Sequence, residues 1–278
     1  MKDYKIKKPM YAKEEMGRLT KWFFALPLII VIWLTLSFVM PVWTANQRIK
    51  MLMNIISYLV FLGSTFIVVK YFLKFPLKKL FNESCKFNYK NLFIGFACMF
   101  AISAGTTFIW KAIEPQNFTY SLLPGWPVDF ALSFVLVLIA AVLEELLCRS
   151  YLVYFVKDSI ETNSKKKAYY ILSSAIFFTI VHFQNPEVQG SSAIYSMIFY
   201  FIMGAALMAV TLKTKGIEAA IGIHIANNLV NAWLFTYKEA ALITNALYTH
   251  SNNIGPLLLV QASVCVILSI IVIDRSSR

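Results

Sequence analysis

The sequence predicts an all-α membrane protein, a polytopic bundle of about eight transmembrane helices. Composition is the first observation: 59% of the 278 residues are hydrophobic and only 14% are charged, and the mean hydropathy is +0.65. A soluble domain has an apolar share of about 45 to 50%, even when glycine is counted. The second observation is that the apolar residues gather into runs of about 20, the length that a helix needs to cross a bilayer.

These runs define the predicted helices. Proline and glycine interrupt the polar segment 114–127, and Pro186 ends the fifth helix. The fourth run is longer than one crossing requires, which predicts a tilted helix or an extension beyond the membrane. The predicted helices cover residues 22–42, 51–73, 91–113, 128–156, 168–186, 194–212, 216–235 and 254–273.

Positive charge lies mainly between the apolar runs. The chain has 26 Lys and Arg against 14 Asp and Glu, a net charge of +12. By the positive-inside rule, the loops 70–90 and 157–167 and the turn 213–215 belong in the cytoplasm, and both termini lie on that side. Arg48 and Lys50, in the first short loop, disagree with this orientation. Membrane topology accounts for the charge and no recognised nucleic-acid-binding motif accompanies it, so we expect no nucleic-acid partner.

We expect a single membrane domain, residues 22–278, behind a basic cytoplasmic N-terminal segment, residues 1–21. That segment and the first apolar run resemble a signal peptide. The run is too long, however, and no small-x-small cleavage site follows it, so we predict a retained first transmembrane helix. The four cysteines are scattered without C-x-x-C spacing, which indicates neither a zinc knuckle nor a disulfide framework.

Two carboxylates and an arginine interrupt the fourth run. A charge near the bilayer centre costs about 2.5 to 3.5 kcal/mol on insertion scales, so ionisable residues inside a membrane segment indicate function. Glu145 and Arg149 are four residues apart and can pair on one helix face. Glu144 points elsewhere around the helix and stays available as a general base. A purely structural ion pair at the end of a long helix is the alternative.

Histidine and asparagine add polar groups to two later helices. His182 lies near the end of the fifth predicted helix, one turn after Phe178, and His224 and Asn228 share a face of the seventh. Each could be structural, because buried His and Asn side chains also join membrane helices through hydrogen bonds. Together with the charged residues of the fourth run, however, they are sufficient to build a buried catalytic cluster. His250, in a polar loop, receives no role.

This series of motifs on successive helices resembles that of the CAAX protease and bacteriocin-processing family, also called Abi. The family includes the Ras-converting type of CAAX prenyl endopeptidase and bacterial relatives linked to bacteriocin immunity and peptide processing. The matching region, residues 128–232, would be the protease core. The motifs are Glu144-Glu145-x-x-x-Arg149, Phe178-x-x-x-His182 and His224-x-x-x-Asn228.

The resemblance implies an intramembrane glutamate endopeptidase. Its substrate would be a peptide or lipidated protein at the lipid bilayer, cleaved near its C-terminus or leader. Glu144 would activate a water and His182 would hold and polarise it, while His224 and Asn228 would stabilise the oxyanion. No metal or other cofactor is expected. The supporting residues would be Glu145, Arg149 and Phe178.

Other functions stay open at this point. A zinc hydrolase could use two histidines and a glutamate, but the sequence lacks H-E-x-x-H and Asn228 would add little to a metal site. A polytopic transporter or proton relay would also need intramembrane polar groups. It should distribute them along a path, whereas here they are concentrated on three helices. A non-proteolytic bacteriocin-immunity protein would keep the family fold without catalysis.

Overall fold

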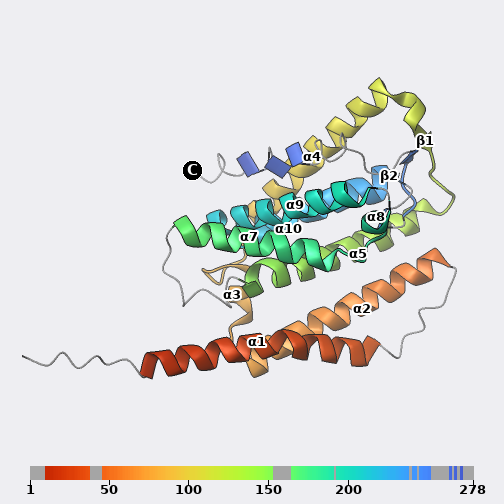
Figure 1. Cartoon of the computed structure of the whole chain (residues 1–278). Coiled ribbons are helices and arrows are strands. Elements are labelled where there is room, and N and C mark those ends of the chain that lie inside the picture. Colours follow the sequence, from red (N-terminus) through yellow and green to blue (C-terminus); the bar gives the residue numbers. More distant parts are fainter. Residues whose placement is uncertain are drawn as a thin grey trace, which may run out of the picture.

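The computed structural model is a bundle of helices with a small sheet at one end (Figure 1). The chain is thus a polytopic all-α membrane protein, as predicted. The structure describes residues 10–37, 46–152, 164–190, 192–237, 240–242, 244–251 and isolated positions between 263 and 271.

Nine α-helices lie within these described residues, and three of them continue into a π-helical turn. The wider turns follow α2 at Val68–Phe72, α5 at Leu146–Tyr151 and α10 at Val230–Leu234. Such turns occur most often inside longer helices and at functional sites. The helices are α1 (Met10–Ser37), α2 (Gln47–Ile67), α3 (Leu77–Phe81), α4 (Tyr89–Ile113), α5 (Trp126–Glu145), α7 (Ser164–Val181), α8 (Pro186–Gln189), α9 (Ala193–Thr214) and α10 (Glu218–Leu229).

The first seven predicted helices each coincide with a helix of the structure, but their lengths differ. α1 already begins at Met10, inside the segment 1–21. Among the described residues, four helices are long and apolar enough to cross a membrane, and two shorter ones are apolar. The long spans are Gln47–Phe72, Tyr89–Ile113, Trp126–Tyr151 and Ala193–Thr214; the shorter are Thr20–Leu36 and Lys167–Val181.

The seventh predicted helix agrees closely with the structure. α10 has 12 residues and continues into its π-helical turn as far as Leu234, after which the chain enters a strand. Nearly all of its residues are buried, so it is a core helix that other helices surround. The eighth predicted helix, residues 254–273, lies largely outside the described residues, and the count of eight therefore stays a prediction.

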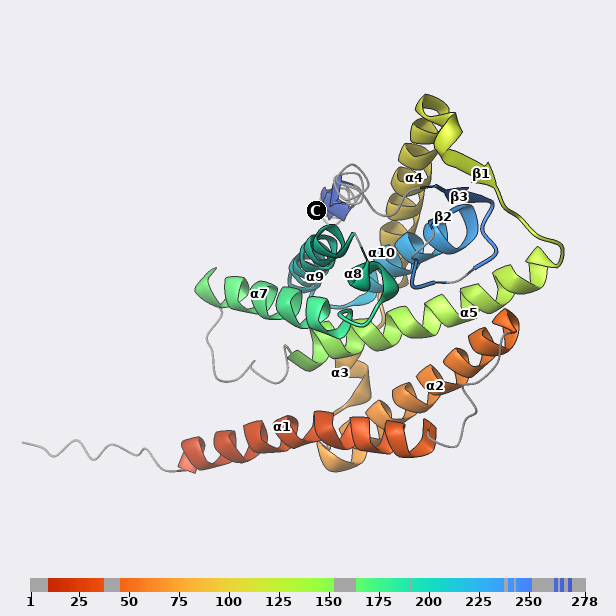
Figure 2. The same ribbon diagram turned by 45° about the vertical axis from the view of Figure 1, so that its right-hand side comes forward.

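α5 is the central helix of the bundle (Figures 1 and 2). α2 packs against one side of α5, and α1 lies beyond α2. α10 packs against the other side of α5 and has its most extensive contact with α4, while α7 packs mainly on α9. Side chains from α5 and α10 therefore face each other inside the bundle.

Glycine allows α10 and α4 to approach each other closely. A Cβ atom on Gly222 would lie 2.1 Å from the carbonyl oxygen of Leu92, and one on Gly95 would lie 2.5 Å from the carbonyl oxygen of Ala219. Both obstacles are backbone atoms, which cannot rotate away. Small residues at such contacts are typical of membrane helix bundles. This close contact fixes the position of α10 in the core.

A three-stranded sheet closes one end of the bundle (Figure 2). Its central strand, β3 (Tyr248–His250), is antiparallel to β1 (Phe118–Tyr120) and parallel to β2 (Phe235–Tyr237). The sequence does not predict this sheet, because strands of three residues are too short to show an alternating pattern. Aromatic side chains hold it together, with the rings of Phe118 and Phe235 6.0 Å apart.

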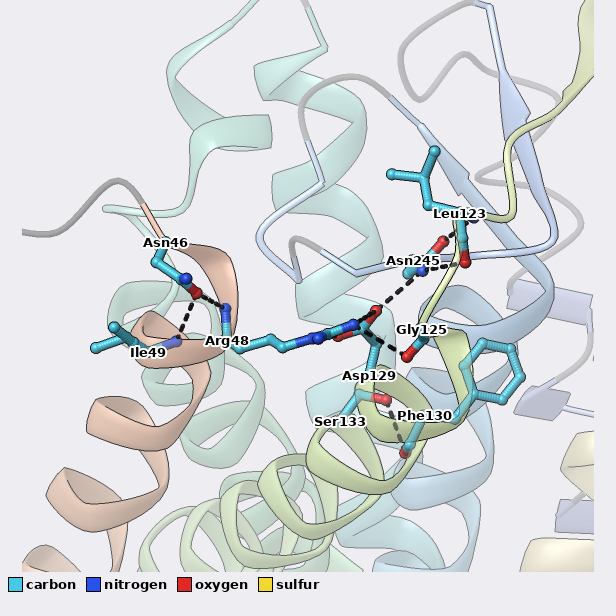
Figure 3. A network of polar contacts seen from close by, with 9 residues as sticks. All are labelled: Asn46, Arg48, Ile49, Leu123, Gly125, Asp129, Phe130, Ser133 and Asn245. Carbon is cyan, nitrogen blue, oxygen red and sulfur yellow. Dashed lines mark hydrogen bonds and ion pairs between the residues drawn. The ribbon is translucent and has the colours of Figure 1, made fainter.

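At the same end, an ion pair ties α5 to α2 (Figure 3). The Nε atom of Arg48 lies 2.6 Å from Oδ1 of Asp129, and its Nη2 atom donates to Oδ2 at 3.2 Å and to the carbonyl oxygen of Gly125 at 3.1 Å. Asn245 donates to Asp129 at 3.0 Å and to the carbonyl oxygen of Leu123 at 3.1 Å. Arg48, which disagrees with the positive-inside orientation, therefore has a structural role that accounts for its position.

We expect Gly222→Ala to destabilise the protein by about 1 to 3 kcal/mol, because the added methyl group has no space. Gly105→Ala, on α4, is the matched control, since a Cβ atom there meets no heavy atom within 4 Å and alanine favours the helix. Thermal unfolding of the purified variants in detergent checks the difference. Equal melting temperatures for the two variants would contradict the close contact of α10 with α4.

Replacing Arg48 should loosen the sheet end of the bundle. Arg48→Ala leaves the carboxylate of Asp129 without its cation, and only 8% of Asp129 is exposed, so we expect a lower melting temperature in detergent. Lys50→Ala removes an exposed charge from the same turn and should have little effect. A loss of stability that is the same in both variants would indicate a general charge effect instead of the ion pair.

Candidate active site

Three elements bring polar side chains together beside α5. Glu144 lies in the last turn of α5, His182 is the first residue after α7, and His224 lies in the middle of α10. The Nε2 atoms of His182 and His224 lie 3.5 and 3.6 Å from the same oxygen, Oε2 of Glu144. That oxygen is buried and has no hydrogen-bond donor among the described residues. The structure therefore places both predicted histidines beside the predicted base.

The Nδ1 atom of each imidazole faces a hydrogen-bond acceptor. Nδ1 of His182 lies 2.6 Å from the carbonyl oxygen of Phe178, and Nδ1 of His224 lies 2.8 Å from Oε1 of Glu145. A carbonyl oxygen or a carboxylate only accepts hydrogen bonds, so Nδ1 carries the hydrogen in both rings. Both histidines therefore offer Nε2 to Glu144, and the rings cannot exchange the roles of their nitrogens without losing these bonds.

The predicted ion pair of Glu145 with Arg149 is present and lies entirely inside the protein. Nη1 of Arg149 is 3.0 Å from Oε1 of Glu145, and both side chains are 0% exposed. None of the guanidinium nitrogens makes a well-aligned hydrogen bond within the described part of the chain. The arginine instead lies over the ring of Phe178, 4.4 Å from its centroid, where the ring face attracts a cation.

Phe178 contacts both imidazoles of this cluster as well as Arg149. Its ring lies 4.4 Å from that of His182 and 5.8 Å from that of His224. Gly204 makes its position possible, because a Cβ atom on Gly204 would lie 2.9 Å from the Cβ atom of Phe178. The close approach of α9 to α7 at this glycine holds Phe178 between Arg149 and the two imidazoles.

Asn228 lies apart from the bonded cluster. It follows His224 by one turn on α10 and is half-buried. Its described hydrogen bond is to its neighbour: Oδ1 accepts from the side-chain amide of Asn227 at 3.1 Å. The structure thus places Asn228 on the same helix face as His224 but shows no contact between Asn228 and Glu144 within the described residues.

A second polar group, formed by Tyr200, Asn185 and Glu187, contacts His182. The sequence does not predict this group. The ring of Tyr200 stacks on the imidazole of His182, with centroids 4.1 Å apart and planes at 24°. The hydroxyl of Tyr200 donates to Oε1 of Glu187, and the side-chain amide of Asn185 donates to the hydroxyl at 2.8 Å. Asn185 stands at the end of the fifth predicted helix and Glu187 in the loop after it, where polar residues are expected, and Tyr200 stands in an apolar run. Composition therefore gives no signal for this group.

Metal binding has no additional support from the geometry. Within the described ranges, no group of three or more His, Cys, Asp or Glu side chains has an arrangement suited to a metal ion. The arrangement instead provides one buried carboxylate oxygen beside two oriented imidazoles, which suits proton transfer to and from a small molecule held between them.

Removing only the cation of the buried ion pair should lower the stability of the protein far more than removing both charges. We expect Arg149→Met to destabilise the protein by about 3 to 5 kcal/mol, because Glu145 then keeps an unbalanced buried charge. In the double variant with Glu145→Gln this charge is gone, and much of the stability should return. Thermal unfolding of the three variants in detergent measures this coupling. A double variant that is no more stable than Arg149→Met would contradict the pairing.

The sequence of the chain is similar to those of known proteins. A protein of Bacillus subtilis (strain 168), described as uncharacterized protein YyaK, is 24% identical over 200 residues, which cover 70% of this chain and 64% of the relative. No solved structure matches the chain. Residues 124–230 match the family model of the type II CAAX prenyl endopeptidases that are Rce1-like. This segment contains the motifs and almost coincides with residues 128–232, so the chain is similar over it to the Rce1-like endopeptidases, in line with the resemblance to the CAAX protease and bacteriocin-processing family.

Proposed function

We propose that this protein is an intramembrane endopeptidase that uses Glu144 as its general base. The observation that carries the proposal is the convergence of one buried carboxylate oxygen of Glu144 with the Nε2 atoms of His182 and His224. The Rce1-like match supports a CAAX endopeptidase, and hence a hydrolase, in general. The apolar helices around the cluster support cleavage within the membrane.

The reaction begins with a water held between Glu144 and His182. Their facing atoms are 3.5 Å apart, so a water that lies beside the line joining them can reach both. His182, with its hydrogen on Nδ1, has a lone pair on Nε2 that accepts one hydrogen of this water. Glu144 removes the other hydrogen as the water oxygen attacks the peptide carbonyl carbon. The carboxylate thus provides the proton acceptor that the attack requires.

The negative oxygen that forms on the carbonyl needs hydrogen-bond donors. Nε2 of His224 faces Glu144, and Nδ1 faces Glu145. When Nε2 carries a hydrogen, it donates to the oxyanion, with the amide of Asn228 one turn further along α10. Loss of one such donor typically costs about 100- to 1000-fold in rate.

The tetrahedral intermediate breaks down when Glu144 returns the proton. The C–N bond breaks, the proton passes from Glu144 to the leaving nitrogen, and the products are a carboxylic acid and an amine. The water supplies the new carboxyl oxygen, and Glu144 ends in its starting state. The substrate that we propose is a membrane-associated protein with a lipidated cysteine near its C-terminus, in keeping with the CAAX prenyl endopeptidases of the family. A peptide leader is the alternative site of cleavage.

We also propose that both termini face the cytoplasm. The basic segments of the chain support this orientation, and Arg48, which disagrees with it, is engaged by Asp129.

Glu144→Gln and His182→Ala should each lower the cleavage rate by about 100- to 10,000-fold, because each removes a partner of the attacking water. The measurement uses purified protein in lipid nanodiscs and a farnesylated peptide, with the products identified by mass spectrometry. Glu114→Gln, at the end of α4, is the matched control and should keep full activity. Full activity in Glu144→Gln would exclude the glutamate mechanism.

The same assay decides the zinc alternative. We expect activity to survive exhaustive chelation, because Glu144 and His182 activate the water without an ion. If chelation abolishes cleavage and added zinc restores it, the carboxylate and the two imidazoles are zinc ligands and the proposed mechanism is wrong.

A further inference from the structure

We propose that Asn185, Glu187 and Tyr200 are positioning residues that hold the imidazole of His182 in place for the reaction. These three residues are called the Tyr200 bracket below. The inference rests on the proposed function, since it concerns how His182 comes to face Glu144.

His182 needs such support because it lies outside a helix. α7 ends at Val181, and His182 begins the turn that leads to α8. Its backbone amide donates to the carbonyl oxygen of Thr179 at 3.2 Å, a tight turn that does not itself fix the side chain. A single hydrogen bond, from Nδ1 to the carbonyl oxygen of Phe178, restrains the imidazole. The imidazole can still turn about this hydrogen bond, which would move Nε2 away from Glu144.

The bracket prevents this rotation by closing a ring of contacts. The backbone amide of Asn185 donates to the carbonyl oxygen of His182 at 3.0 Å. The side chain of Asn185 donates to the hydroxyl of Tyr200 at 2.8 Å, and the ring of Tyr200 stacks on that of His182. The ring of Phe178 also contacts the imidazole and lies near that of Tyr200, so two aromatic rings restrain His182 from different directions.

Glu187 anchors the hydroxyl of Tyr200 and ties α8 to α9. Its Oε1 atom accepts from Tyr200 and, at 3.3 Å, from Asn185. Ser196 of α9 donates to its carbonyl oxygen at 3.1 Å. Only 3% of Glu187 is exposed, and its second oxygen has no hydrogen-bond partner among the described residues. A buried carboxylate with one oxygen that lacks a hydrogen bond lowers the stability of the fold. Such a cost is expected where the carboxylate positions a functional residue.

The first test separates positioning from substrate binding. We expect Tyr200→Leu, which loses the stacked ring, to lower kcat by about 100-fold, because displacement of a catalytic group by about 1 Å has an effect of this size. KM should stay within about twofold, since the bracket does not touch the substrate. Tyr200→Phe keeps the ring but loses the hydroxyl that Asn185 and Glu187 hold, so its kcat should lie between those of Tyr200→Leu and wild type. Tyr195→Phe, on the same helix α9, is the matched control and should behave as wild type. A raised KM with unchanged kcat would overturn the proposal.

The second test separates positioning from a role of the negative charge. Glu187→Gln keeps an oxygen that accepts from Tyr200 and Asn185, so it should retain a kcat within about threefold of wild type. Glu187→Ala loses these bonds and should lower kcat by about tenfold or more. If Glu187→Gln is as slow as Glu187→Ala, the charge and not the hydrogen bonding matters, and the positioning role is wrong. If Glu187→Ala does not fold, the comparison of Tyr200→Phe with Tyr200→Leu decides.

A third measurement does not depend on catalysis. Diethyl pyrocarbonate acylates accessible imidazole nitrogens, and mass spectrometry gives the rate at His182 alone. We expect Tyr200→Leu to raise this rate about tenfold and Tyr195→Phe to leave it unchanged. An unchanged rate in Tyr200→Leu would overturn the bracket. A raised rate in a protein that cleaves no peptide would keep the bracket and refute the proposed function, so the two failures are distinguishable.

Discussion

The buried contact of Arg149, Glu145 and His224 is the interaction on which the rest of the structure depends. Charges in a membrane interior are costly unless they are paired, and here one carboxylate oxygen of Glu145 faces both Nη1 of Arg149 and Nδ1 of His224. The contact joins the end of α5 to α10. It also orients the imidazole of His224, because Nδ1 is committed to Glu145 and only Nε2 remains for Glu144. The proposed mechanism thus divides structural support and chemical function between two adjacent glutamates.

The surrounding architecture provides the dry and rigid environment that this contact requires. α10 is almost completely buried, and two glycines at its contact with α4 allow its backbone to fit. Electrostatic interactions are stronger in such an interior than in water. Oriented groups that are excluded from water are also the ones that contribute most to catalysis. The same packing therefore stabilises the fold and prepares the site.

Much of this arrangement could be predicted from the sequence, and the remainder could not for physical reasons. Apolar runs give the helices, and the spacing of Glu145 and Arg149 gives their pairing, because both depend on local periodicity. The contacts of Arg48 with Asp129 and of Tyr200 with His182 join residues that are far apart in the chain or lie in apolar or loop contexts, so no local pattern reveals them. Among the predicted site residues, Asn228 is the one whose described bond lies outside the cluster.

The central claim, that Glu144 activates a water for direct attack, is tested by single-turnover cleavage followed by mass spectrometry of the whole protein. Direct attack predicts that both peptide fragments appear at the same rate and that the mass of the protein never changes. Early release of the amine fragment, with the acyl fragment attached to the chain, would contradict the account, because it would show a covalent nucleophile in place of water.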